Sequence, residues 1–169
     1  MQLGQYGRSI ADHLAQRGVI GRFAIDFVAT KTKDGHWGLN AVEINLRNGG
    51  TTHPALTLMA LTDGDYSQED GTFCAAGVPK HYVATDHLEV PKLRSLTPDD
   101  VLDLIDGDGL GWDHETQTGA VLHLVSGVAV AGRVGVTAIG NSAAEASASF
   151  GRFEQALTGA ASSQLSGSR

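Results

Sequence analysis

The chain has 169 residues, of which 41% are hydrophobic, so it can bury the core of one domain or of one domain with an appendage. Its formal net charge of -7 argues against non-specific nucleic-acid binding, which requires clustered cations. The single cysteine cannot form an internal disulfide, the opening residues do not resemble a signal peptide, and no apolar run approaches the roughly 20 residues that span a bilayer. We expect a soluble, cytoplasmic protein that binds neither nucleic acid nor a membrane.

The first part of the sequence alternates helix and strand patterns. Apolar residues at four-residue spacing predict a helix over residues 3–17. Residues 19–30 and 37–46 have strand patterns, and Asp34-Gly35 between them supplies the turn of a hairpin. A further helix is expected over residues 54–61.

The second part contains, in order, a polar loop, a short strand, a helix, two strands and a final helix. We expect these elements over residues 63–77, 82–88, 98–106, 119–125, 128–139 and 142–158. The helix over residues 98–106 has the clearest start, because Thr97 is a good N-cap and is followed by proline and two aspartates. The small, polar tail over residues 159–169 is expected to be disordered.

The hairpin carries polar side chains on one face. Side chains alternate between the faces of a strand, so Glu43, Asn45 and Arg47 share one face and the apolar residues between them share the other. Asp26 faces away from the aromatic side chains of its own strand, and pairing of the strands would bring it near Glu43 or Asn45. Burying polar and charged side chains such as these costs free energy unless they have hydrogen-bond or charge partners. Three oxygen donors in one patch suit magnesium, which prefers oxygen ligands and keeps several waters.

An aspartate in a strand, a hairpin, then Glu-x-Asn-x-Arg and a glycine–threonine loop resemble the metal-binding half of the ATP-grasp superfamily. Residues 43–54, Glu-Ile-Asn-Leu-Arg-Asn-Gly-Gly-Thr-Thr-His-Pro, look most like peptide ligases and carboxylate–amine ligases. Residues 132–140 show a weaker resemblance to the extension that follows the ATP-grasp core in some of these enzymes. The resemblance implies an α+β fold, with a mainly antiparallel sheet and packed helices, corresponding to the C-terminal lobe of an ATP-grasp enzyme.

The resemblance also implies roles for single residues. Asp26, Glu43 and Asn45 would hold two magnesium (or manganese) ions against the phosphates of ATP, and Glu43 would bridge both ions. Glu43 and Asn45 would thereby bind the nucleotide. Arg47 would be catalytic, because it would steady the acyl phosphate that forms when a substrate carboxylate attacks the γ-phosphate, before an amine displaces the phosphate.

The loop after the second strand would bind the carboxylate substrate. It leads into the N-terminus of a helix, where free backbone N–H groups and the helix dipole favour an anion. The substrate-binding residues implied here are Gly50, Thr51, Thr52 and His53.

The resemblance is strongest over residues 18–61. It implies that residues 1–62 are the C-terminal half of an ATP-grasp core, residues 63–158 an extension packed on it, and residues 159–169 a tail. Complete ATP-grasp enzymes also have an upstream lobe, with a glycine-rich loop and lysines that contact ATP. We expect the chain alone to be inactive and to act with a missing N-terminal lobe or through self-association.

Plainer interpretations remain open for the same residues. Asp26, Glu43 and Asn45 could form a solvated sheet face, Arg47 could be a salt-bridge partner, and residues 51–53 could simply cap a helix. The alternative function is a non-catalytic binding or interaction module that retains an ATP-grasp lobe. Loss of magnesium-dependent stabilisation on substitution of Glu43 would distinguish the two functions.

Four other features are expected to be structural. Residues 112–115 contain possible metal ligands but are expected to form an exposed turn. We expect His123 to be a core or edge histidine, Arg133 to join a surface ion pair, and Cys74 to pack as a small hydrophobe.

Overall fold

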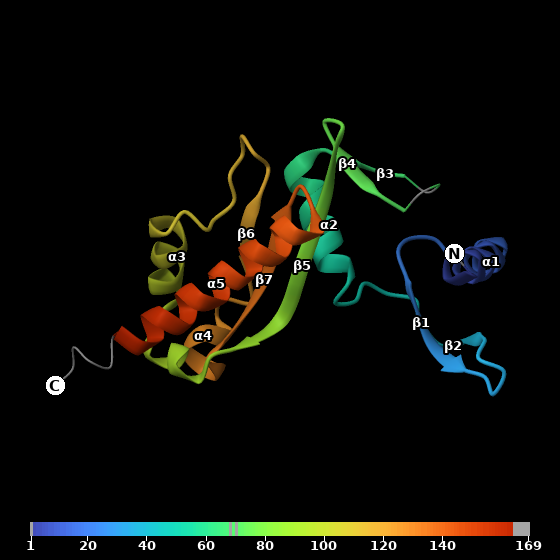
Figure 1. Cartoon of the computed structure of the whole chain (residues 1–169), viewed down its shortest axis with the longest axis horizontal. Helices are drawn as coiled ribbons and strands as arrows, with labels where there is room; N and C mark the ends of the chain where they lie inside the picture. The colour runs from blue at the N-terminus through green and yellow to red at the C-terminus, as the bar shows by residue number, and fades with distance from the viewer. Residues whose placement is uncertain (1, 68, 70, 164–169) are drawn as a thin grey trace. The chain divides into compact units, whose positions relative to one another are not determined.

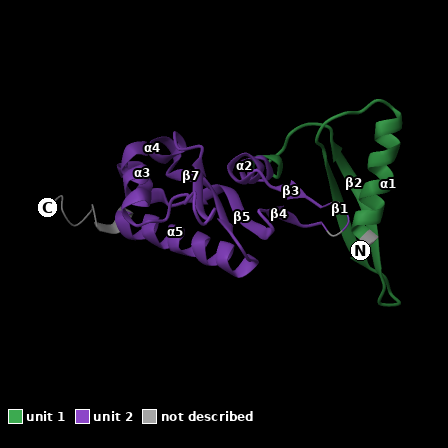
Figure 2. Cartoon of the chain, turned by 90° about the horizontal axis from the view of Figure 1, so that it is seen from above, with its two compact units in different colours: residues 1–53 green, residues 54–169 purple. Residues whose placement is uncertain are grey.

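A computed structural model describes residues 2–67, 69 and 71–163. The chain divides into two compact units, residues 1–53 and residues 54–169 (Figure 2). Every pair of named neighbouring strands is antiparallel, and helices are distributed along the whole chain (Figure 1). The expected α+β class with a mainly antiparallel sheet is therefore confirmed. No helix in the described ranges is both long and apolar enough to cross a membrane.

Unit 1 consists of one helix and one hairpin. The helix α1 (Gln2–Gln16) matches the predicted helix, and β1 (Ala24–Lys31) pairs with β2 (Trp37–Asn45) as expected. The first strand begins five residues later than predicted, at Ala24. The pairing of Ala24 with Asn45 is the last in the ladder, so residues 19–23 have no partner strand.

Unit 1 has no buried core of its own. None of the side chains described between residues 3 and 53 is buried. Several large apolar side chains are instead widely exposed, among them Ile20 at 94%, Trp37 at 62% and Val42 at 60%. Packing within this unit alone therefore removes little apolar surface from water.

Unit 2 contains a five-stranded sheet. Its strands follow the spatial order β3-β4-β5-β7-β6. Their bounds are β3 (Asp65–Tyr66), β4 (Phe73–Ala75), β5 (Val78–Glu89), β6 (Gly119–His123) and β7 (Arg133–Gly140). The helices of unit 2 are η1 (Pro91–Ser95), α3 (Pro98–Gly107), α4 (Gly127–Ala131), α5 (Ala143–Ser163) and all but the first two residues of α2 (Thr52–Thr62).

The core of unit 2 lies between its sheet and its helices, with α5 running along the sheet (Figure 1). The strand β7 sits between β5 and β6 and is buried from Val134 to Gly140. Its Val134 and Val136 belong to the same buried cluster as Phe153 and Leu157 of α5. The side of α5 that carries Phe153 and Leu157 is thus the side that stabilises this unit.

Side-chain caps fix the start of two helices. The Thr97 hydroxyl accepts a hydrogen bond from Asp100 N at 3.2 Å, and Asp100 Oδ2 accepts one from Thr97 N at 2.7 Å. This reciprocal pair is a capping box and confirms the predicted start of α3. Before α5, Ser142 Oγ accepts from Glu145 N at 3.1 Å, while Glu145 Oε2 accepts from Asn141 N at 2.7 Å.

Two predicted elements are wrong in part. Residues 63–77 are not all loop, because β3 and β4 lie within them; β4 pairs with β5 through a two-residue turn, and β5 is correspondingly longer than predicted. The expected strand over residues 128–139 begins only at Arg133. The strand β6 ends at His123, opposite Gly135, and the connection forms α4, which places Val128 in the core.

The predicted boundaries also differ from the compact units. The helix α5 continues to Ser163, so the expectation of disorder is wrong for residues 159–163, and residues 164–169 lie outside the described residues. The boundary between the compact units falls between residues 53 and 54 of the chain, whereas the sequence predicted a division after residue 62. The functional division at residues 62 and 158 stays a prediction.

Candidate metal and substrate site

The hairpin brings the predicted oxygen donors onto one face. Asp26 of β1 lies directly opposite Glu43 of β2, and the neighbouring pair on the same face is Ala24 opposite Asn45. Directly opposed residues of an antiparallel pair point to the same side, with Cβ atoms about 4.5–5.5 Å apart. Asp26, Glu43 and Asn45 therefore form one group, as the alternation of the sequence predicted.

A β-bulge adds a fourth polar residue to this face. The register shifts between Asp26 and Phe27, so that Phe27 pairs with Ala41, Val28 with Asn40, and Val42 is the extra residue. Without the bulge, strict alternation from Glu43 would place Asn40 on the opposite face. Asn40 was not predicted from the sequence, and the available signal was a third polar residue in the same strand as Glu43 and Asn45.

The carboxylates of this group are not engaged elsewhere in the protein. Within residues 2–67, 69 and 71–163, no hydrogen bond or ion pair involves the side chains of Asp26, Glu43, Asn45 or Asn40. Asp26 and Glu43 are exposed and Asn45 is half-buried. Two like charges facing each other across a sheet destabilise the pair unless a cation lies between them.

The side chains on this face fit a metal ion whose remaining ligands are water or phosphate oxygens. The described part of the chain holds no group of three or more His, Cys, Asp or Glu side chains able to form a metal cage. Magnesium commonly takes only one or two protein carboxylates and completes its six oxygens with water and phosphate. Asp26, Glu43 and Asn45 could supply the protein ligands of such an ion. They are too few for a zinc or calcium site made of protein ligands alone.

Arg47 is not on the strand, which corrects one expectation. The strand β2 ends at Asn45, because β1 offers no partner for the next two residues, and Arg47 lies in the following bend. Its side chain is exposed, and Nη1 donates to the carbonyl oxygen of Asn48 at 3.3 Å. Strand alternation therefore does not orient Arg47, and its predicted catalytic role stays a prediction.

The glycine–threonine loop closes on itself before α2. Gly49 N donates to Thr52 Oγ1 at 3.1 Å, and Thr52 N donates to the carbonyl oxygen of Gly49 at 2.9 Å. Thr52 thus fixes the loop that precedes the helix. Gly50, Thr51 and His53 are exposed around it. The loop has the placement expected of an anion site at a helix N-terminus, and substrate contact by these residues stays a prediction.

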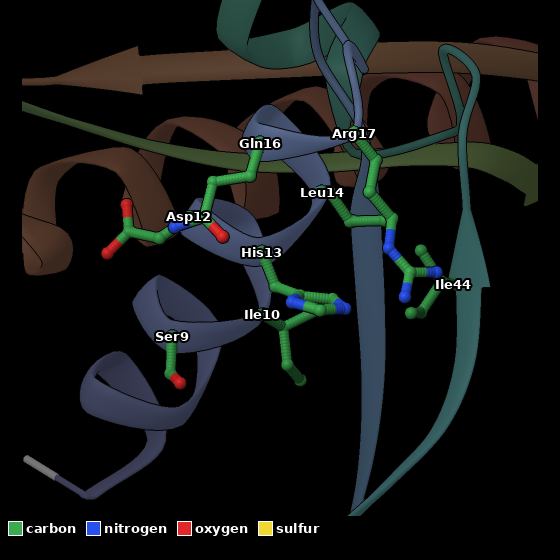
Figure 3. Close-up of a pocket in the computed structure, with 8 residues that line it drawn as sticks. All are labelled: Ser9, Ile10, Asp12, His13, Leu14, Gln16, Arg17 and Ile44. Carbon is green, nitrogen blue, oxygen red and sulfur yellow. The ribbon is translucent and has the colours of Figure 1, made fainter.

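A cavity of about 700 Å³ lies on the other face of the hairpin, between α1 and β2. Ile10 and His13 of α1 line it together with Arg17, which follows the helix, and Ile44 of β2 (Figure 3). Ile44 neighbours Glu43 in the strand, so the two side chains point to opposite faces. The cavity is consequently not the metal site.

Two of the features predicted to be structural, residues 112–115 and Arg133, make hydrogen bonds within the protein surface. Asp113 Oδ1 accepts hydrogen bonds from Glu115 N at 2.9 Å and Thr116 N at 2.7 Å, and the turn predicted over residues 112–115 is found over residues 114–117. Arg133 joins a surface network, with Nη1 at 3.0 Å from His87 Nδ1, and His87 Nε2 lies 2.9 Å from Glu89 Oε1.

The chain is thus an α+β protein whose hairpin gathers oxygen donors on one exposed face. Residues 100–149 match a family model described as the PGM1 C-terminal domain. Over 150 residues the chain is 33% identical to an L-propargylglycine–L-glutamate ligase of Streptantibioticus cattleyicolor, covering 89% of this chain and 30% of that ligase. No solved structure matches the chain.

These matches support the resemblance found in the sequence, which is to the C-terminal portion of ATP-grasp ligases. It spans 30% of the length of the ligase that it matches. The family match covers α3 from Asp100 onward, β6, α4, β7 and the start of α5, and so lies within unit 2.

Proposed function

We propose that the chain is the magnesium-binding part of an ATP-dependent carboxylate–amine (peptide) ligase. The observation that carries the proposal is the direct opposition of Asp26 and Glu43, beside Asn45, without a partner for any of these side chains in the described protein. Magnesium supplies charge neutralisation at the phosphates of ATP when bound. Asp26, Glu43 and Asn45 would hold and orient it, with Glu43 between two ions, and manganese would serve in its place.

Arg47 and the adjoining loop are proposed to handle the carboxylate substrate. Arg47 would stabilise the negative charge of an acyl phosphate, and its exposed guanidinium is tied only to its own loop through Asn48. Thr52 would keep the loop closed while Gly50, Thr51 and His53 offer backbone and side-chain donors to the carboxylate. An amine, such as that of an amino acid, would then displace phosphate.

Unit 1 is proposed to complete its core against further polypeptide. None of its described side chains is buried, and Ile20, Trp37 and Val42 are largely exposed. Exposed apolar surface of this kind marks an interaction site. The proposed occupant is the nucleotide-binding lobe of the same ligase, and the chain alone would be inactive. Self-association through this surface is the alternative arrangement, and a non-catalytic interaction module is the alternative function.

The test is a titration of the isotope-labelled chain with Mg²⁺, alone and with ADP, followed by amide NMR shifts. We expect saturable shifts centred on residues 24–28 and 40–47, reversed by EDTA. Glu43→Gln should abolish them, since it removes the proposed bridging carboxylate while retaining its size. Asp34→Asn, which removes an exposed acid in the hairpin turn, is the matched control and should titrate like the parent chain.

Equal responses of Glu43→Gln and the parent chain would exclude the metal assignment. The interaction-module alternative would then be favoured if the chain formed a stable homo-oligomer that did not depend on metal.

A further inference from the structure

A second cavity lies in unit 2, away from the hairpin. It has a volume of about 230 Å³ and is formed by the segment 109–119 together with α5. Its polar lining includes Asp113, Thr116, Thr118, Glu145, Ser149 and Arg152. None of these residues has a role in the function proposed above.

Three residues of α5 line the cavity from one helix face. Glu145, Ser149 and Arg152 follow the spacing i, i+4, i+7, which repeats on one face of an α-helix. Glu145 and Arg152 carry opposite charges two turns apart, about 10 Å along the helix axis. Over the described ranges of the chain, Arg152 forms no ion pair with Glu145 or Asp113. Arg152 therefore faces the cavity without a direct ion pair to either carboxylate. Glu145, in contrast, accepts a hydrogen bond from Asn141 N and interacts electrostatically with Lys80.

Ser149 supplies an uncharged polar group to the lining of the cavity. Its exposed fraction is 4%, and its hydroxyl makes no hydrogen bond to any other residue that the structure describes. Its oxygen is not among the fully buried side-chain atoms without a partner, so it is open to the cavity, where water or a ligand can hydrogen-bond to it. Ser149 lies between Glu145 and Arg152 along the face of α5 that lines the cavity.

The opposite wall is fixed in place before any ligand arrives. Asp113 N donates to the carbonyl oxygen of Thr118 at 2.8 Å, which closes the loop. Lys80 is 7% exposed, and its Nζ donates to the carbonyl oxygens of Thr116 at 3.3 Å and Gln117 at 3.1 Å and to Asn141 Oδ1 at 2.6 Å. These bonds link the loop to the segment that precedes α5. A preformed wall lowers the ordering cost of binding.

Gly119 sets how closely this loop folds back. Its φ is 122°, and a Cβ at this position would lie 2.1 Å from the carbonyl oxygen of Gly111. Only glycine permits this approach of the backbone to itself. The loop conformation that shapes the cavity is therefore specified by the sequence.

We propose that this cavity binds a small zwitterion of the size of an α-amino acid. Arg152 would receive the carboxylate, Glu145 and Asp113 the ammonium group, and Ser149 a hydrogen bond. The cavity is smaller than the roughly 300–1,000 Å³ of sites for drug-sized ligands, which suits a ligand of a few heavy atoms. Two carboxylates beside one arginine disfavour a polyanion such as a nucleotide. This site is separate from the proposed metal site and does not require it.

The experiment is an amide NMR titration of the full chain with L-alanine in the presence of EDTA. We expect saturable shifts at residues 109–119 and 145–152. Acetate carries only the negative group of the zwitterion and methylammonium only the positive one. Each should bind at least about tenfold more weakly than L-alanine, because each loses the charge-assisted hydrogen bonds of the missing group. Arg152→Gln and Glu145→Gln should each weaken L-alanine binding by a similar factor.

Control variants separate this site from general charge effects and from the metal site. Arg94→Gln removes an exposed arginine of η1 outside the cavity and should bind L-alanine like the parent chain. Glu43→Gln should also leave the titration unchanged, so failure of the metal assignment would not affect this result. The proposal is overturned if L-alanine produces no saturable shifts, or if folded Arg152→Gln and Glu145→Gln chains both titrate like the parent.

Discussion

Asp26 and Glu43 face each other directly across β1 and β2, two negative charges in neighbouring positions on an exposed sheet face. Protein surfaces usually place an opposite charge or an uncharged group at such a position, because like charges directly opposite are destabilising. No cationic side chain forms an ion pair with either carboxylate within the described residues. We propose that a cation from solution neutralises the pair.

This relationship predicts that removing one charge has opposite effects with and without metal. In EDTA, Asp26→Asn should stabilise the hairpin by about 0.5 kcal/mol, because the repulsion between the strands is removed. In saturating Mg²⁺ the same variant should be less stable than the parent, since it loses a ligand. Amide hydrogen exchange of residues 24–31 and 37–45 measures both differences. For the control Asp34→Asn, the stability difference from the parent should have the same sign with and without Mg²⁺. If the stability difference for Asp26→Asn also kept its sign, the metal assignment would be contradicted.

The β-bulge predicts a difference between two adjacent positions of β2. Asn40→Asp adds a carboxylate to the face of Asp26 and Glu43, because Asn40 pairs with Val28. Ala41→Asp adds the same charge to the other face, because Ala41 pairs with Phe27. Asn40→Asp should bind Mn²⁺ more tightly, by up to about tenfold, and Ala41→Asp should not. Paramagnetic broadening of the hairpin amides by Mn²⁺ measures both affinities. Equal affinities of the two variants would argue against a site on this face.

Sequence periodicity predicted the face of Asp26, Glu43 and Asn45, because alternation in a regular strand depends only on local geometry. It did not predict Asn40, because a bulge depends on how two strands pair. Arg47 was misplaced for a related reason: where a strand ends is decided by its partner, and β1 stops pairing at Ala24. Local sequence patterns therefore specify which side chains share a face of a strand. Pairing between strands specifies where a strand ends and which residues lie opposite each other.

The same distinction explains the errors in unit 2. The start of α3 was predicted well, because the capping box of Thr97 and Asp100 is a short-range signal. The segment of α4 resembled a strand because Val128 and Val130 alternate with small residues. It is helical because it connects two antiparallel strands and places Val128 in the core. The cavity beside α5 was not foreseen, because it joins residues more than 30 positions apart, such as Asp113 and Arg152.

Lys80 is predicted to stabilise unit 2 through the loop that it holds. Lys80→Met removes three hydrogen bonds from a charged donor and leaves two carbonyl oxygens and the Asn141 amide oxygen without this partner. The expected loss is about 2 kcal/mol, since the burial that lowers the pKa of Lys80 offsets part of what its hydrogen bonds contribute. Chemical unfolding of unit 2 measures the loss. Lys33→Met, at an exposed position of the hairpin, is the control and should leave this transition unchanged.

Asp113 predicts a pH dependence for the loop 109–119. Hydrogen bonds from Thr116, first from its backbone N–H and then from its hydroxyl, hold the pKa of the Asp113 carboxyl below its ordinary value of 3.8. The ionised form is therefore favoured in the native state. Its stabilising contribution is complete above pH 3.8 and is lost as the pH falls through the lower native pKa. Acidification from pH 6 should thus loosen this loop.

Asp113→Asn tests this dependence, because its amide oxygen can accept the same hydrogen bonds without ionising. The variant should be less stable than the parent at pH 6, and the difference should shrink as the pH falls below 3.8. Unfolding measured at a series of pH values gives the difference directly. Thr116→Val keeps the backbone N–H and removes only the hydroxyl, so it should retain most of the pH dependence of the parent. A difference between Asp113→Asn and the parent that stays constant from pH 6 to acid would show that the Asp113 charge does not stabilise this loop.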